Sequence, residues 1–168
     1  MKKSILSLCF VLIMATLVNA APRFGVIFEQ TKGAGVYLND DMFTGELTVG
    51  AVSDTANNKT ELTNISVALN YKIALDAAIA FTTGIGYEIH TGKVGSNYDA
   101  SVASESEIEL SNLLAIQVGI ERALSSNLIL TAEVDAFSIA NLKYKGSGEA
   151  KVKTTRFFSN SRIGIAYL

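Results

Sequence analysis

The chain has 168 residues, of which 49% are hydrophobic and 18% charged, and it contains one cysteine. Its 14 basic and 16 acidic residues give a formal net charge of −2 at pH 7. This balance argues against a general nucleic-acid binder, which would show a basic patch or stripe, and the length suits a single domain.

The first twenty residues, 1–20, are expected to be a cleaved secretory signal peptide. Lys2 and Lys3 form a basic start, and the apolar stretch that follows is short for a membrane span. The tripeptide ending at Ala20 offers the small residues that a signal peptidase reads. The predicted mature domain, 21–168, then has no cysteine, which excludes both a disulfide and a Cys-based metal site. Without the two lysines it carries 12 basic and 16 acidic residues, a net charge of −4.

Apolar and polar residues alternate along almost the whole predicted domain. The pattern begins at Phe24, is clearest over 64–73 and 79–90, and continues to Tyr167. Because successive side chains of a strand point to opposite faces, such runs indicate strands with one apolar and one polar face. In chain order the sequence predicts eight strands, over 23–31, 34–39, 43–53, 62–73, 77–90, 107–121, 128–144 and 150–168.

The predicted connections alternate between short and long. The short ones lie near 40–42, 74–76 and 122–127, and 32–33 is also short. The longer ones, rich in Gly, Ser, Asn, Asp and Lys, lie near 54–61, 91–106 and 145–149. This alternation is expected of strands that run up and down in a sheet whose two ends differ.

Alternation alone does not separate a soluble sandwich from a membrane barrel, in which the apolar face meets lipid and the polar face lines the lumen. The predicted strands often exceed ten residues, whereas soluble strands cluster near ~5–6 and a tilted membrane strand needs roughly 9–11. The polar face carries small residues and opposite charges, as a narrow lumen requires. The predicted fold is therefore an all-β, eight-stranded antiparallel up-and-down transmembrane β-barrel.

Two sets of residues follow from this register. Aromatic side chains at strand ends are expected to form a girdle at the membrane interfaces: Phe24, Tyr37, Phe43, Tyr71, Tyr87, Tyr144 and Tyr167. Charged side chains on the polar face are expected to form a network that plugs the lumen: Arg23, Glu46, Lys72, Glu88, Glu121, Glu133, Asp135, Arg156 and Arg162. An eight-stranded barrel is just filled by its side chains, so we expect structure rather than conduction.

The secretory leader, the segment "LNYKIALDAAIAFTTGIGYEI" and the closing "RIGIAYL" resemble the small eight-stranded outer-membrane barrels of Gram-negative bacteria, the OmpA-like and opacity-protein-like group. The resemblance is one of pattern over the whole mature domain. It implies a place in the cell outer membrane, insertion by the barrel-assembly machinery, and contact with outer-membrane lipids and lipopolysaccharide. Members of the group usually end in Phe, whereas this chain has Leu168, a departure that bears on assembly.

Catalytic and metal sites are weakly indicated. A Ser-His-Glu arrangement would draw on His90, Glu88 and the loop serines Ser96, Ser101 and Ser104, but a rim histidine in contact with water is the expected state. Zinc would need carboxylates for all its other ligands. The acidic residues Glu105, Glu107 and Glu109 alternate along a strand and do not form a calcium loop, so no cofactor is expected.

The sequence thus predicts a non-enzymatic outer-membrane protein with a structural or adhesin-like surface-interaction role. The interaction would use the loop 91–106, and the sequence does not identify its extracellular ligand. Two alternatives remain: an enzyme that modifies the acyl chains of lipid A, and a soluble periplasmic barrel that binds an apolar ligand.

Two local irregularities are also expected. The hairpin over 23–39 is short for a full crossing, and a bulge near Phe157-Phe158 would shift the outer part of the last strand, where Ser159 and Ser161 otherwise face lipid.

Overall fold

The computed structural model describes residues 22–54, 60–94, 106–145 and 151–168. The expected signal peptide and the central part of the loop 91–106 lie outside these ranges, so their predictions stay untested. Within the described ranges no helix is long and apolar enough to cross a membrane.

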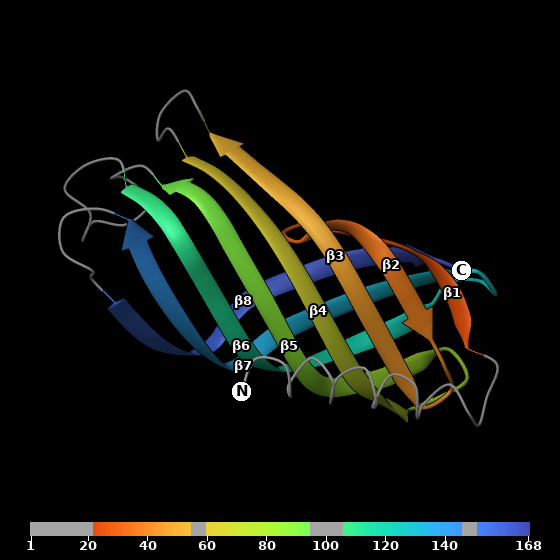
Figure 1. Cartoon of the computed structure of the whole chain (residues 1–168). Helices are drawn as coiled ribbons and strands as arrows, with labels where there is room; N and C mark the ends of the chain where they lie inside the picture. The colour runs from red at the N-terminus through yellow and green to blue at the C-terminus, as the bar shows by residue number, and fades with distance from the viewer. Residues whose placement is uncertain (1–21, 55–59, 95–105, 146–150) are drawn as a thin grey trace.

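Eight antiparallel strands form a single closed ring. They are β1 (Arg23–Glu29), β2 (Gly33–Asn39), β3 (Phe43–Asp54), β4 (Thr60–Ala74), β5 (Ile79–Val94), β6 (Ser106–Ala123), β7 (Leu128–Lys145) and β8 (Lys151–Tyr167). Each strand pairs with its neighbours in sequence, and β1 pairs with β8 to close the barrel (Figure 1). The predicted all-β class, the closed antiparallel barrel, the strand number and the up-and-down order are confirmed.

Three short connections, β2–β3, β4–β5 and β6–β7, gather at one end of the barrel, at the right of Figure 1, whereas the short β1–β2 turn lies at the opposite end of its own hairpin. In the turn between β4 and β5, the backbone N–H groups of Ala78 and Ile79 both donate to Oδ1 of Asp76, at 2.6 and 2.7 Å. Ser125 does the same in the turn between β6 and β7, where its Oγ accepts from the N–H groups of Asn127 and Leu128. Asp and Ser favour tight turns because their side chains satisfy backbone donors two or three residues ahead.

The β1–β2 hairpin is much shorter than the other strands. The predicted strand over 23–31 ends at Glu29 because residues 30–32 form the turn, and Gly33 follows with a φ of +92°, a conformation that favours glycine. β1 pairs with β8 only over Val26–Glu29, and β2 pairs with β3 no further than Val49. Figure 1 shows that the hairpin stops partway along β3, so the expectation of a short first hairpin is confirmed.

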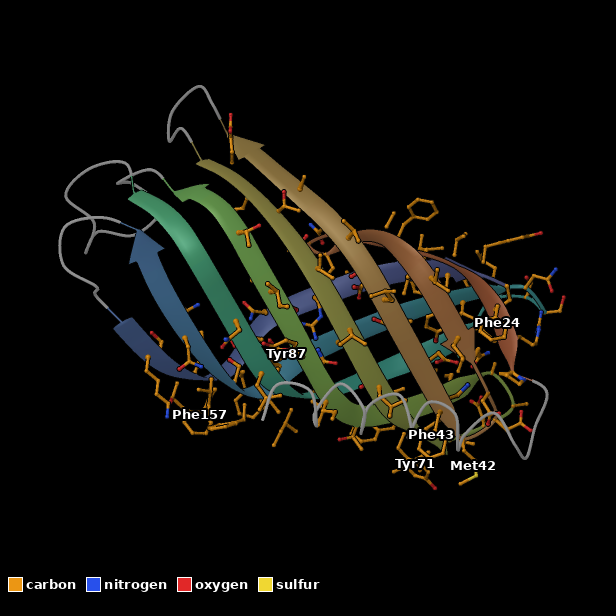
Figure 2. The ribbon with its side chains drawn as sticks, viewed as in Figure 1. Phe24, Met42, Phe43, Tyr71, Tyr87 and Phe157 are labelled. Carbon is orange, nitrogen blue, oxygen red and sulfur yellow. The ribbon has the colours of Figure 1, made fainter. Side chains whose placement is uncertain are left out.

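β8 contains the expected irregularity. Its register against β7 shifts between Arg162 and Ser159, and Phe158 and Asn160 have φ values of 49° and 51°. The shift turns the Ser159 hydroxyl toward that of buried Ser138, at 3.1 Å, so Ser159 does not take the outward position that the unshifted register would give it. The bulge also leaves Phe157 exposed on the outside of the barrel (Figure 2).

The distribution of burial is inverted relative to a soluble barrel. Along β3, Leu47 is 51% exposed while the neighbouring Thr48 is 0% exposed, and along β4 Ile65 is 48% exposed while Ser66 is 2% exposed. Among the described residues, seventeen buried side chains are polar or charged and nine are hydrophobic. The apolar face of the ring therefore points outward, and the polar face lines the interior.

Candidate functional site

The charged interior of the barrel is the candidate functional site, and Arg162 on β8 lies at its centre. The guanidinium NH1 is 2.9 Å from Oδ1 of Asp135, and NH2 is 3.6 Å from a carboxylate oxygen of Glu133, both on the adjacent β7. On the other side it lies 3.8 Å from Glu88 of β5, a strand that is not a neighbour of β8. Arg162 is 3% exposed, so its charge is balanced by protein carboxylates within the lumen.

A second group of charges surrounds Lys32, which lies in the β1–β2 turn. Its ammonium is 3.6 Å from Glu29 of β1 and 3.9 Å from Glu46 of β3, and all three side chains are buried. The short hairpin places the lysine here, because its turn ends partway along the barrel and faces the interior. Carboxylate oxygens of Glu29, Glu46 and Glu133 lie within 4.8 Å of one another. The ammonium of Lys32 and the guanidinium of Arg162 lie beside these carboxylates and supply the opposing positive charge.

A third group lies closer to the short-turn end. The ammonium of Lys72 on β4 is 2.9 Å from Oε1 of Glu121 on β6, across the intervening β5. The hydroxyl of Tyr37 on β2 donates to Oε2 of the same carboxylate at 2.8 Å. Lys72 also donates to the side-chain oxygen of Asn39 at 2.7 Å. Glu121 on β6 is therefore contacted by donors from two strands, β2 and β4, and β6 pairs with neither of them.

Amide side chains add further contacts across the interior. Asn70 of β4 donates to Glu133 of β7 at 2.8 Å, and these two strands are separated by β5 and β6. Asn160, at the β8 bulge, donates to Oδ2 of Asp135 at 2.8 Å. Because the bond from Asn70 connects strands that are not paired, it runs through the lumen and not along its wall.

The structure brings together seven of the nine residues predicted for the network: Glu46, Lys72, Glu88, Glu121, Glu133, Asp135 and Arg162. The other two are placed differently. Arg23 is exposed at the short-turn end, where it donates to the backbone oxygen of Ser126 and the side chain of Asn127. Arg156 is exposed on the outer part of β8, beyond the reach of the hairpin. Their predicted burial in the lumen is wrong, because the ring of eight strands does not surround either position.

Two interior residues were missed by the pattern. Lys32 falls in the connection predicted at 32–33, where alternation gives no face, and Tyr37 was assigned to the outer girdle. The excess of negative charge in the interior is the observation that could have indicated Lys32. Among the described interior residues, six carboxylates (Glu29, Glu46, Glu88, Glu121, Glu133 and Asp135) face only Lys72 and Arg162 unless a further cation is present.

Tyr37 is 0% exposed and points inward, so its place in the predicted girdle is wrong. Val36 is exposed on the outside, and strand alternation then turns Tyr37 into the barrel, where it pairs with Gly25 and Glu46 in register. The other aromatic residues with described side chains point outward: Phe24, Phe43, Tyr71, Tyr87 and Tyr167. Phe43 and Tyr71 meet edge to face at 5.4 Å near the short-turn end (Figure 2). The side chain of Tyr144 is outside the described set.

A small apolar cluster lies inside the barrel at the short-turn end. It contains Ile27, Tyr37, Ile129 and Ala166, with Leu168 packed against it. The backbone N–H of Leu168 donates to the carbonyl of Asn127 at 2.8 Å, which fixes this residue beside the β6–β7 turn. An open cavity of about 300 Å³ at this end is bordered by Arg23, Lys72, Glu121 and Leu168. Leu168, the residue that departs from the expected ending, thus contributes to the inner wall.

The predicted catalytic arrangement is only partly described. Nε2 of His90 lies 3.2 Å from Oε2 of Glu88, so the pair expected from their spacing on β5 is present. The loop serines lie outside the described residues. Glu88 also lies 3.8 Å from Arg162, which connects this pair to the charge network.

The sequence matches no protein-family model and no curated protein. The structure is similar to a major outer membrane protein from Thermus thermophilus, with 16% identity, a TM-score of 0.40, and coverage of 88% of this chain and 98% of that one. It is also similar to CarO of Acinetobacter baumannii, with 12% identity, a TM-score of 0.38, and coverage of 88% and 97%.

Proposed function

We propose that this chain is an integral outer-membrane protein whose barrel crosses the bilayer and has no enzymatic activity. The observation that carries the proposal is the inverted distribution of burial, with apolar side chains outside and charged side chains inside the ring. Exposed apolar residues occur on every strand for which side chains are described, among them Val26, Val36, Leu47, Val67, Ile85, Ile116, Ala132 and Ile163.

This arrangement fits a hydrocarbon solvent better than water. Exposed apolar surface in water is unfavourable by roughly 25 cal/mol per Å², and contiguous patches beyond a few hundred Å² mark binding surfaces. In a bilayer the same surface is matched to its solvent. A closed ring of strands also satisfies its backbone groups internally, as the hydrocarbon region requires. The short turns would face the periplasm and the longer connections the exterior.

The interior supports a closed lumen. Asn70–Glu133, Tyr37–Glu121 and Lys72–Glu121 each join strands that are not paired, so they cross the space through which ions would pass. The proposed role is therefore structural, or interaction at the cell surface through the loop 91–106, with lipids and lipopolysaccharide as neighbours and the assembly machinery as a transient partner. Purified protein should give no large, steady conductance in planar bilayers, and such conductance would contradict the closed lumen.

The test of the membrane proposal is extraction combined with heat-modifiable mobility. The protein should require detergent for release from outer membranes, and the unheated sample should migrate differently from the boiled one. Recovery from the periplasm without detergent would favour the soluble barrel. Replacement of His90 by Ala with unchanged lipid A in the cells would argue against the acyl-modifying enzyme.

A matched pair of substitutions makes this test quantitative. Leu47 lies within an outward row of β3, whereas Met42 lies in the β2–β3 turn, and both are 51% exposed. In a membrane, Leu47→Arg should destabilise the barrel by about 2–4 kcal/mol, because the charge enters the hydrocarbon, while Met42→Arg near the interface should cost about 0–1 kcal/mol. The measurement is urea unfolding in lipid vesicles. Equal, small effects would show that both positions face water.

A further inference from the structure

The negative charge of the interior exceeds the positive charge that the structure places there. Among the described residues, six interior carboxylates face three cations, which are Lys32, Lys72 and Arg162. Lys72 lies 2.9 Å from Glu121, so that pair is neutral by itself. The excess of three negative charges, six against three, therefore falls on the carboxylates around Lys32 and Arg162, and a protonated His90 would remove only one of them. Because uncompensated buried charge is costly, this region favours the binding of a further cation.

Three of these carboxylates converge next to the β1–β2 turn, and we call Glu29, Glu46 and Glu133 the acidic triad. They come from β1, β3 and β7, and one oxygen of each lies within 4.8 Å of the other two. Some point in space is then no more than about 2.8 Å from all three oxygens, close to the roughly 2.3–2.6 Å at which calcium binds oxygen. Magnesium requires a strict octahedron at about 2.0–2.1 Å, and zinc sites are built mainly from nitrogen and sulfur ligands. The acidic triad therefore matches calcium in ligand type and in spacing.

The side chains that meet here lack hydrogen-bond partners within the described part of the chain. Both carboxylate oxygens of Glu29, Oε2 of Glu46 and Oε2 of Glu133 accept no hydrogen bond from the described residues, and Nζ of Lys32 donates none to them. The side chains of Glu29 and Lys32 are 1% and 2% exposed, and the ammonium points at the acidic triad from 3.6 and 3.9 Å, beyond hydrogen-bonding distance. Buried polar groups in this state ordinarily contact a bound water or ion. Four carboxylate oxygens are thus available to coordinate a cation.

The acidic triad lies where the enclosed part of the barrel meets its outer part. β1 pairs with β8 only as far as Glu29, whose partner is Gly164, and the turn residue Gln30 donates to the carbonyl of Ile163 at 3.1 Å. Figure 1 shows that the hairpin stops at this level. Further out on β8, none of the described side chains from 153 to 161 is buried. An ion therefore has a shorter path to the acidic triad from the outer side than from the short-turn end.

We propose that the acidic triad is a calcium-binding site, in which Lys32 is a tethered counter-ion that the metal displaces. A divalent ion removes two of the three excess negative charges, whereas a monovalent ion removes only one. Calcium accepts irregular arrangements of oxygen ligands, and the flexible stem of a lysine lets its ammonium move aside as the ion enters. Because β1, β3 and β7 are not paired with one another, the bound ion joins the short hairpin to the far wall of the barrel. The site lies in the interior, so the inference does not depend on the medium that surrounds the barrel.

The experiment is a calcium titration of the refolded barrel in detergent, followed by isothermal titration calorimetry and by urea unfolding. Wild-type protein should bind one calcium ion per chain and should unfold at higher urea concentration in CaCl₂ of up to about 10 mM, since a ligand that binds only the folded state stabilises it. Glu29→Gln keeps the shape of the side chain but removes a charged ligand, so it should weaken calcium binding about tenfold or more. Lys32→Met should strengthen calcium binding about tenfold or more, because the competing ammonium is lost.

Glu121→Gln is the matched control. It also removes one buried carboxylate from the interior, but this carboxylate lies 2.9 Å from Lys72 and outside the acidic triad. Its affinity for calcium should stay within about threefold of the wild-type value, as expected for a position without shared ligands. A loss at Glu121→Gln that equals the loss at Glu29→Gln would mean that only the summed charge of the interior matters, and the acidic triad would not be the site.

The ion series separates calcium from other sources of positive charge. MgCl₂ at the same concentration should stabilise the barrel less, and NaCl of equal ionic strength should not reproduce the shift. No calcium binding by the wild type would overturn the proposal, as would equal affinities for wild type and Glu29→Gln. If CaCl₂ has no effect while a lower pH stabilises the barrel, protons balance the excess charge and the metal site is wrong.

Two further readouts keep the result interpretable. A Glu29→Gln variant that retains heat-modifiable mobility is folded, so its weaker binding reports on the ligand. If this variant does not fold, Glu46→Gln removes a second ligand of the acidic triad and carries the same expectation. Calcium binding by a barrel that is recovered from the periplasm without detergent would contradict the membrane location and leave the calcium site standing.

Discussion

Two arginines of β8, Arg162 and Arg156, differ sharply in burial. Arg162, beside the stretch Gly164–Tyr167 that pairs with β1, is 3% exposed and contacts three carboxylates. Arg156, six residues away on the outer part, is exposed. Within the described sheet, the inner part of β8 lies between β7 and β1, whereas the outer part has a strand partner only in β7.

The difference shows that the length of the β1–β2 hairpin determines where the interior begins. The hairpin contributes Glu29, Lys32 and Tyr37 to the lumen, and all three are buried. In the outer part of β8, beyond the level of the hairpin turn, none of the described side chains from Lys153 to Ser161 is buried. A charge network therefore forms where all eight strands surround it, since ion pairs gain strength as water is excluded.

Breaking the network at Arg162 should have the largest effect. Arg162→Met keeps most of the side-chain volume but leaves Asp135, Glu133 and Glu88 without their shared cation. Removing one partner of a buried ionic group costs about 3–5 kcal/mol, so the free energy of unfolding should fall by that amount. The measurement is urea unfolding of the barrel in vesicles.

Arg156→Met provides the control on the same strand. An exposed charge away from special contacts changes stability by no more than about 0.5 kcal/mol, so this variant should unfold like the wild type. Equal losses for the two variants would mean that the outer part of β8 is as enclosed as the inner part, contrary to the structure.

Removing the Tyr37 hydroxyl should have an intermediate effect. Tyr37→Phe eliminates a buried hydrogen bond to the Glu121 carboxylate, while Lys72 remains 2.9 Å from the same group. A hydrogen bond to a charged group contributes about 1.5–3 kcal/mol, which is the expected loss in the free energy of unfolding. Tyr71→Phe, on the outward face, is the matched control and should change stability by less than about 0.5 kcal/mol. Equal changes in the free energy of unfolding for the two variants would mean that the Tyr37 hydroxyl does not stabilise the interior of the folded barrel.

Sequence reasoning succeeded where a feature depends on local alternation. The faces of β3 to β6 follow from period two, which is why Glu46, Glu88 and Glu121 were assigned to the interior and are buried there. It failed where the feature depends on pairing between distant segments. The burial of Arg156 depends on how far the hairpin 23–39 reaches along β8, and no spacing within β8 encodes that distance. Lys32 was missed for the same reason, since its position follows from the height of a turn.

The smallest expected effect concerns neutral hydrogen bonds. Thr48 on β3 and Ser66 on β4 share one at 2.6 Å inside the part that the hairpin covers, and both are buried. Asn141 on β7 donates to Asn112 on β6 at 3.0 Å on the outer part of the barrel, where Asn141 is exposed. Each pair connects two neighbouring strands through one neutral hydrogen bond, and the two pairs differ in their exposure to water.

Thr48→Ala should lower the free energy of unfolding by about 1–3 kcal/mol, because Ser66 is left with an unsatisfied buried hydroxyl. Asn141→Ala should lower it by less than about 0.5 kcal/mol, since water replaces the lost partner of Asn112. Both values come from urea unfolding in vesicles of one composition. A loss at Asn141 that equals the loss at Thr48 would place the Asn141–Asn112 pair in a dry environment, contrary to the exposure of Asn141 in the structure.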